Sequence, residues 1–185
     1  MNTALIVIDV QESFRQRPYW QDGEFPAFIA HTQSLIDRCR ASGIPVLQVF
    51  HVEPGDASQP FSAASGHVRT MRELSIQPDA VFRKSVHSAM FGKDEAGQTL
   101  ESWLRDHGTE RLLVTGIRTE QCCETTTRHA SDLGFDVRYV MDATLTFPMR
   151  GANGREYSAA DIRERTALVL ADRFAKIVSA DTALA

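Results

Sequence analysis

The sequence lacks the features that would assign the chain to a membrane or an export route. No apolar run approaches the roughly 18 consecutive residues that a membrane-spanning helix requires. The first residues pass directly into an apolar, strand-like segment at 3–8, without the basic and apolar regions of a signal peptide. We therefore predict a cytoplasmic protein with no membrane partner.

Cysteine is scarce, and positive charge is not in excess. Only Cys39, Cys122 and Cys123 are present, and no Cys-x-x-C pair or Cys/His cluster has zinc-finger spacing. An odd number of cysteines in a cytoplasmic chain favours free thiols over disulfides. The 24 acidic residues outnumber the 20 Lys and Arg residues, which gives a net charge of −4. The sequence therefore predicts no nucleic-acid partner.

Strand-like and helix-like segments alternate along the 185 residues. This alternation predicts one α/β domain over residues 1–185, a three-layer, Rossmann-like fold with a mostly parallel six-stranded sheet. The expected strands lie at 4–8, 44–50, 80–83, 111–115, 135–141 and 174–179. The expected helices lie at 25–41, 99–106, 124–133 and 158–171. A loop as long as the polar connection at 51–79 is usually functional or covers a partner subunit.

Three chemically active side chains follow predicted strands, namely Asp9, Lys84 and Cys122. Open parallel sheets bind ligands at the carboxyl ends of their strands, so these groups are expected to converge. Taken singly, each has an ordinary explanation as a turn former, a solvated cation or a packed thiol. A helix opening at Cys122 would present unpaired N–H groups and the positive end of its dipole, both of which favour a thiolate. We interpret Cys39 and Cys123 as packing residues.

Three ordered segments carry a family resemblance. The first, ALIVIDVQESF at 4–14, has an Asp-x-Gln-x-x-Phe pattern at Asp9, Gln11 and Phe14. The others are FRKSVHSAMFGKDEAGQTLESWL at 82–104 and VTGIRTEQCCETTTRHASDLGFDVRYVMDAT at 114–144. Together they resemble the motifs of the isochorismatase-like cysteine hydrolases. That superfamily also contains nicotinamidases, N-carbamoylsarcosine amidases and related amide or ureido hydrolases.

The resemblance implies a catalytic triad of Asp9, Lys84 and Cys122. Cys122 would attack a carbonyl carbon, Asp9 would move the proton, and Lys84 would stabilise the charged states. The resemblance also implies a cis peptide bond between Ile117 and Arg118, with the backbone N–H groups of Arg118 and Cys122 forming an oxyanion hole. The expected reaction is cleavage of a C–N bond in a small amide, ureido or carbamoyl substrate through a Cys thioester.

Departures from the family pattern narrow this expectation. Nicotinamidases have an Asp-x-His metal motif after the second strand, whereas this chain has Val49-Phe50-His51. His51 and His67 alone are a weak metal set, so we expect neither a metal nor any other cofactor. Two alternatives stay open: vinyl-ether hydrolysis of the isochorismatase type, against which Cys122 argues, and thiol redox chemistry at Cys122 and Cys123.

Residues on the loops after the strands are candidates for a substrate pocket. These candidates are Phe14, Trp20, His87, Phe91, Phe147 and Met149. The Arg118 side chain either pairs with a substrate carboxylate or points to solvent, and we favour solvent. The expected partners are a small-molecule substrate and further copies of the chain in a homodimer or homotetramer, to which Phe61 in the long loop would contribute.

Overall fold

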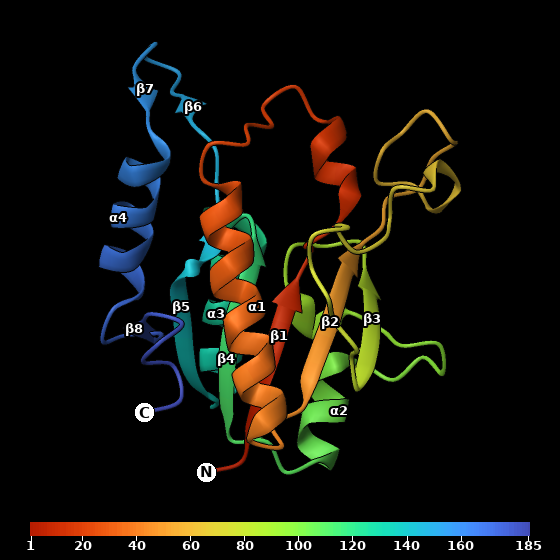
Figure 1. The fold of residues 1–185 in the computed structure, drawn as a ribbon, viewed down its shortest axis with the longest axis vertical. Helices are drawn as coiled ribbons and strands as arrows, with labels where there is room; N and C mark the ends of the chain where they lie inside the picture. The colour runs from red at the N-terminus through yellow and green to blue at the C-terminus, as the bar shows by residue number, and fades with distance from the viewer.

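Strand β1 (Thr3–Ile8) lies inside a six-stranded sheet in the computed structural model, which describes all 185 residues. The strand order is β3-β2-β1-β4-β5-β8, and every neighbouring pair is parallel (Figure 1). The other strands are β2 (Val46–His51), β3 (Ala80–Lys84), β4 (Arg111–Ile117), β5 (Asp136–Leu145) and β8 (Lys176–Val178). The predicted single-domain α/β fold with a six-stranded parallel sheet is confirmed.

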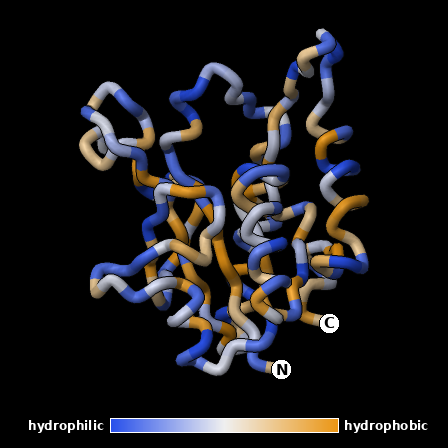
Figure 2. The backbone as a smooth tube through the Cα atoms, turned by 180° about the vertical axis from the view of Figure 1, so that it is seen from behind, coloured by the Kyte–Doolittle hydropathy of each residue, from blue (hydrophilic) through white to orange (hydrophobic).

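Helices cover both faces of this sheet because β1 buries side chains on both. Leu5 and Val7 join an apolar cluster with helix α1 (Phe25–Ala41) on one face. Ile6 and Ile8 point the other way, as alternation along a strand requires, and pack in a cluster with the helices of the second face. Those helices are α2 (Leu100–Asp106), α3 (Glu124–Asp132) and α4 (Ala159–Leu170). Apolar strands accordingly run through the middle of the chain trace (Figure 2).

The helix ends follow the local sequence. Helix α1 has Pro26 in its first turn, where a missing N–H costs nothing, and Gly43 follows its end with φ +68°. Helix α4 begins with a capping box between Ser158 and Asp161. The four short 3₁₀ or π turns are Glu12–Gln16, Ala63–Ser65, Ala89–Phe91 and Thr119–Cys123.

Apart from shifts of one or two residues at other strand and helix ends, the structure differs from the predicted elements in three places. Strand β5 continues to Leu145, four residues beyond the predicted end at Met141. A small hairpin of β6 (Met149–Arg150) and β7 (Glu156–Tyr157) was not predicted, because its strands are two residues long and show no periodicity. Helical structure before α3 already starts at Thr119, in a π turn, so Cys122 lies within the helical stretch and does not open it.

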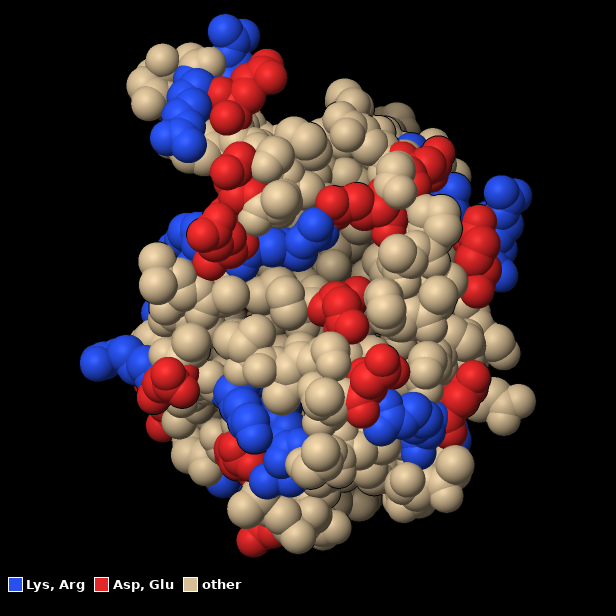
Figure 3. Space-filling view, turned by 60° about the vertical axis from the view of Figure 1, so that its left-hand side comes forward, with Lys and Arg blue, Asp and Glu red and all other residues tan.

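The apolar character of the helices and the charge pattern of the surface indicate whether the protein has the features of a membrane or nucleic-acid partner. No helix combines the length and the apolar character needed to cross a bilayer. On the face drawn in Figure 3, Lys and Arg side chains alternate with Asp and Glu side chains. That face therefore carries no continuous basic surface.

The order of the strands reverses at one place in the sheet, between β1 and β4. Strands β1, β2 and β3 succeed one another in one direction, and β4, β5 and β8 in the other. The order reverses between β1 and β4, and in open α/β sheets ligands bind at the carboxyl ends of the strands at such a reversal. Asp9 follows β1 and Cys122 follows β4, so both lie at this position.

Candidate active site

Asp9 leaves the end of β1 in an unusual backbone conformation. Its φ is +54°, in the left-handed region, which Asp tolerates better than most residues. Its side chain is fully buried and pairs through Oδ2 with the Nζ atom of Lys84 at 2.6 Å. Its Oδ1 atom makes no hydrogen bond. One carboxylate oxygen is therefore fixed, and the other is available to accept a proton.

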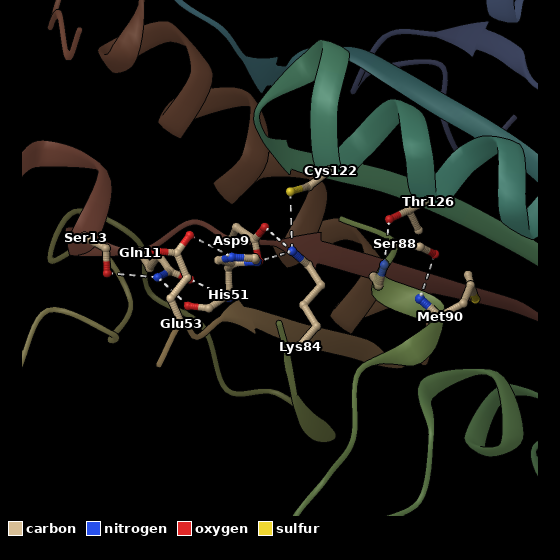
Figure 4. Close-up of polar contacts among 11 residues, drawn as sticks. Asp9, Gln11, Ser13, His51, Glu53, Lys84, Ser88, Met90, Cys122 and Thr126 are labelled. Atoms are coloured by element: carbon tan, nitrogen blue, oxygen red, sulfur yellow. Dashed lines mark hydrogen bonds and ion pairs between the residues drawn. The ribbon is translucent and has the colours of Figure 1, made fainter. Parts of the chain in front are cut away.

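Lys84 is the last residue of β3, and its ammonium group lies at the centre of the site (Figure 4). Nζ donates to Asp9 Oδ2 at 2.6 Å, to His51 Nδ1 at 3.2 Å and to Cys122 Sγ at 3.4 Å. An ammonium has three N–H donors, so these three contacts use all of them. Burial alone would lower the pKa of Lys84, but the negative charge of Asp9, together with the contacts to Asp9 and Cys122, outweighs burial and raises it. Lys84 therefore stays charged.

The surroundings of Cys122 favour the protonated thiol. Burial, followed by the negative charge of Asp9, raises the pKa of Cys122 to about 12, although Lys84 acts in the opposite direction. The helix end and Lys84 were expected to favour a thiolate, but burial and the Asp9 charge outweigh the effect of Lys84. The π turn buries the sulfur next to a carboxylate, and both effects favour the neutral form. Ionisation of Cys122 requires transfer of its proton to a neighbouring base.

His51, at the end of β2, is neutral and has a defined tautomer. Burial and then the Lys84 ammonium lower the pKa of His51. Because Lys84 can only donate, Nδ1 of His51 accepts, and the ring proton is on Nε2, which lies 3.3 Å from Glu53 Oε1. The Gln11 side chain both donates to and accepts from the His51 backbone, at 3.0 and 2.8 Å. The Gln of the Asp-x-Gln-x-x-Phe pattern thus joins β1 to β2.

The site does not fit a nicotinamidase-type metal. Val49 lies in the apolar core, where the metal motif would need a carboxylate. His51 already binds Lys84 and Glu53, and His67 does not line the cavity beside Cys122. No group of three or more His, Cys, Asp and Glu side chains is arranged to hold a metal ion.

The end of β4 and the segment that leads from it to Cys122 are held by close packing and buried hydrogen bonds. Gly116 approaches β1 so closely that a Cβ atom would lie 2.0 Å from the Ile8 carbonyl oxygen. The peptide bond between Ile117 and Arg118 is cis. Thr119 then bonds through its hydroxyl to Thr144 at 2.9 Å and through its carbonyl to the Tyr139 hydroxyl at 2.7 Å. These contacts fix the backbone that leads into Cys122.

A cavity of about 300 Å³ opens beside Cys122. This volume is at the lower end of the range for ligand pockets, which suits a small molecule. The cavity is lined by Asp9, Phe14, Arg17, Tyr19, His51, Glu53, Phe61, His87, Arg118, Gln121 and Cys122.

Of the six predicted pocket residues, only Phe14 and His87 line this cavity. Trp20 packs against Phe25 and Phe147, and Phe147 is itself buried. Phe91 is exposed beside His129 on the outer surface. Met149 borders a different groove, next to α4. These four residues therefore do not line the cavity beside Cys122. The prediction failed for them because a loop position after a strand does not determine which way the side chain points.

Several lining residues were missed by the sequence interpretation, or were placed wrongly. Arg17, Tyr19 and Glu53 belong to no motif, and only the folded loops bring them to Cys122. Phe61 is buried against the rings of Phe14 and His51, so it does not serve as an exposed subunit contact.

The solvent-directed orientation predicted for Arg118 is wrong. The side chain is only 8 % exposed and lies 2.9 Å from Glu120. Its guanidinium carbon is 4.9 Å from the centre of the Tyr19 ring. These neighbours hold Arg118 in the cavity wall.

Nearly the whole chain matches a known family. The family model of the isochorismatase domain covers residues 3–180. An isochorismatase structure from Pseudomonas putida superposes with a TM-score of 0.82 at 25% identity, over 98% of this chain and 89% of that one. The fold and the matched residues define a hydrolase of the α/β class. The chain belongs to the isochorismatase family.

Two curated relatives extend the comparison to named activities. Nicotinamidase 3 of Arabidopsis thaliana is 29% identical over 96% of this chain and 85% of its own length. The ureidoacrylate amidohydrolase of Pantoea ananatis is 29% identical over 77% of this chain and 68% of its own length. Both names describe the hydrolysis of an amide-type C–N bond.

Proposed function

We propose that this protein is a cysteine hydrolase that cleaves a C–N bond of a small amide, ureido or carbamoyl substrate. The observation that carries the proposal is the Lys84 ammonium, which bonds at once to the Asp9 carboxylate and to the Cys122 sulfur. A nucleophile, a proton acceptor and a fixed cation at the sheet reversal make up the apparatus of acyl transfer. The amide-hydrolysing relatives support the same reaction.

The first half of the reaction forms a thioester. Asp9 takes the thiol proton as Cys122 Sγ attacks the substrate carbonyl carbon, and the carbonyl oxygen becomes an oxyanion. The backbone N–H groups of Arg118 and Cys122 are the proposed donors to that oxyanion. When the tetrahedral intermediate collapses, the C–N bond breaks and Asp9 returns the proton to the leaving nitrogen.

The second half releases the acyl group to water. Asp9 accepts a proton from a water molecule, which attacks the thioester carbonyl, and the C–S bond then breaks. The proton returns to Cys122 and restores the neutral thiol. Lys84 stays charged throughout, and it stabilises the carboxylate of Asp9 and the sulfur whenever that carries negative charge.

The test is an ammonia-release screen of small amides, ureas and carbamoyl compounds. We expect wild-type protein to release ammonia from at least one compound and Cys122→Ala to release none. Turnover that survives in Cys122→Ala contradicts the proposal. Failure on every C–N compound, together with hydrolysis of a vinyl ether, would assign the site to the isochorismatase reaction instead.

A further inference from the structure

Arg118 is a buried cation without hydrogen bonds. Its residue is 7 % exposed, and Nε and Nη2 are enclosed without a hydrogen-bond partner. Nη2 lies 2.9 Å from Glu120 Oε1, but the alignment of the two groups gives no hydrogen bond, so this is an ion pair only. The remaining nitrogen, Nη1, likewise bonds to no protein atom, and Arg118 lines the cavity that contains Cys122. A buried guanidinium in this state is poised for an external acceptor.

Aromatic rings and a fixed carboxylate hold this cation in place. The guanidinium carbon lies 4.9 Å from the Tyr19 ring centre and 5.8 Å from that of Phe147. Glu120 is itself anchored, since its Oε2 accepts from the Thr146 hydroxyl at 2.6 Å. A guanidinium stacked in this way keeps one orientation before a ligand arrives, which lowers the cost of binding.

A second arginine approaches the same ring. The guanidinium carbon of Arg17 lies 5.8 Å from the Tyr19 ring centre, and Arg17 also lines the cavity. Of the acidic groups that line the cavity, Asp9 is paired with Lys84, and Glu53 lies against the neutral ring of His51. Arg17 and Arg118 place two guanidinium groups beside the Tyr19 ring in the cavity wall.

We propose that Arg118 and Arg17 bind a carboxylate of the substrate while its C–N bond lies at Cys122. The substrate class is then a small ureido, carbamoyl or amide acid. The inference rests on the proposed C–N hydrolysis and adds the anionic group of the substrate. An uncharged analogue would bury Arg118 without an acceptor, and sites of this type reject such analogues strongly.

The experiment compares each acid with an uncharged compound of the same shape. N-carbamoylglycine is paired with isobutylurea, in which two methyl groups replace the carboxylate oxygens, and both release ammonia only from the ureido carbonyl. We expect kcat/KM to favour the acid by about 10- to 100-fold, the range of one charge-assisted hydrogen-bonded pair. Arg118→Gln should reduce this ratio several-fold, mainly through KM.

Controls separate a binding role from a structural one. Arg72→Gln removes an exposed arginine outside the cavity, and it should leave the ratio and both rates as in wild type. If Arg118→Gln does not fold, the exposed Arg17→Gln variant supplies the same measurement. The inference is overturned if wild type has the same kcat/KM for both compounds, or if Arg118→Gln lowers kcat/KM equally for both. Either result leaves the proposed C–N hydrolysis intact.

A binding measurement makes the two proposals independent. Calorimetry on Cys122→Ala with the same pair needs no turnover. Suppose that wild type releases no ammonia but that Cys122→Ala binds N-carbamoylglycine more tightly than isobutylurea. The carboxylate site is then supported, and hydrolysis of the ureido bond is refuted. If Cys122→Ala shows no preference for the acid, the carboxylate site is refuted.

Discussion

Asp9 and Lys84 act on the thiol of Cys122 in opposite directions. The Asp9 charge raises the pKa of Cys122, and the Lys84 charge lowers it. Burial raises this pKa as well, and its effect is larger than that of either neighbour. Lys84 was predicted to stabilise a thiolate, but the resting site holds a neutral thiol beside a carboxylate. The proton on sulfur is thus part of the ground state, and catalysis must begin by moving it.

Asp9→Asn should therefore separate thiol reactivity from turnover. Loss of the negative charge leaves Lys84 unopposed and lowers the pKa of Cys122, so alkylation by iodoacetamide near pH 8 should become faster. Hydrolysis should fall by about 100-fold or more, because the proton acceptor is gone. Mass spectrometry of the alkylated peptide and ammonia release measure the two effects. Slower alkylation in Asp9→Asn would show that Asp9 activates the thiol at rest.

His51 makes a separate prediction about stability and pH. Its pKa is lowered from the usual 6.5 by burial and by Lys84, so the unfolded chain binds a proton more readily than the folded one. The contribution of His51 is present above pH 6.5 and is lost as the pH falls toward its folded-state pKa. Between about pH 7.5 and 5.5, wild type should lose more Tm than His51→Gln. Equal losses in the two proteins would refute a neutral, buried His51.

At the scale of elements, the approach of β4 to β1 sets the distance between Asp9 and Cys122. Gly116 pairs with Ile8 across the two strands, and it has φ +131° and no room for a Cβ atom. The pairing of β4 with β5 shifts its register next to this residue. The glycine therefore lets two strands, each followed by a catalytic candidate, lie against each other.

Gly116→Ala should weaken both the fold and the site. The added Cβ must displace the β1 backbone, which should lower the free energy of unfolding by about 2 kcal/mol or more and reduce activity. Gly134→Ala is the matched control, since Gly134 also has a positive φ, +89°, but no atom within 4 Å of the added Cβ. Urea unfolding compares the two. A loss in Gly116→Ala no larger than in Gly134→Ala would show that the close approach is unimportant.

The elements were largely predictable, whereas their short additions were not. Unbroken apolar runs such as Ala4–Ile8 are typical of strands covered on both faces, and Gly43 and Gly134 mark helix ends. The strands of the β6–β7 hairpin are only two residues long, which is too short for a periodic pattern to be recognised in the sequence. The inward turn of Arg118 depends on Tyr19 and Glu120, which no local pattern links to it.

At the scale of the whole molecule, the sheet separates the cysteines. Cys39 lies in the α1 cluster on one face, whereas Cys122 and Cys123 lie in the cluster on the other. All three are free and buried. A disulfide needs Cα atoms within about 7 Å, so a bond across the sheet would require unfolding. The homodimer or homotetramer stays a prediction, which light scattering can test.

Mild peroxide treatment should accordingly produce no Cys39–Cys122 disulfide. Oxidation is expected at Cys122 alone, since it lines the cavity and Cys123 is fully enclosed. Non-reducing peptide mapping distinguishes these products, and reduced protein provides the control. An intramolecular disulfide that forms with loss of activity, and whose reduction restores activity, would favour the thiol redox alternative.

The three hydrogen bonds of Lys84 also make Cys122 a reporter of folding. They join residues 75, 38 and 33 positions apart in the chain, and they connect the end of β3 with the ends of β1 and β2 and with the turn after β4. When β3 detaches from β2, the ammonium leaves with it and the sulfur becomes accessible. The alkylation rate of this one atom in dilute denaturant therefore measures how often the β3 edge of the sheet opens while the rest stays folded.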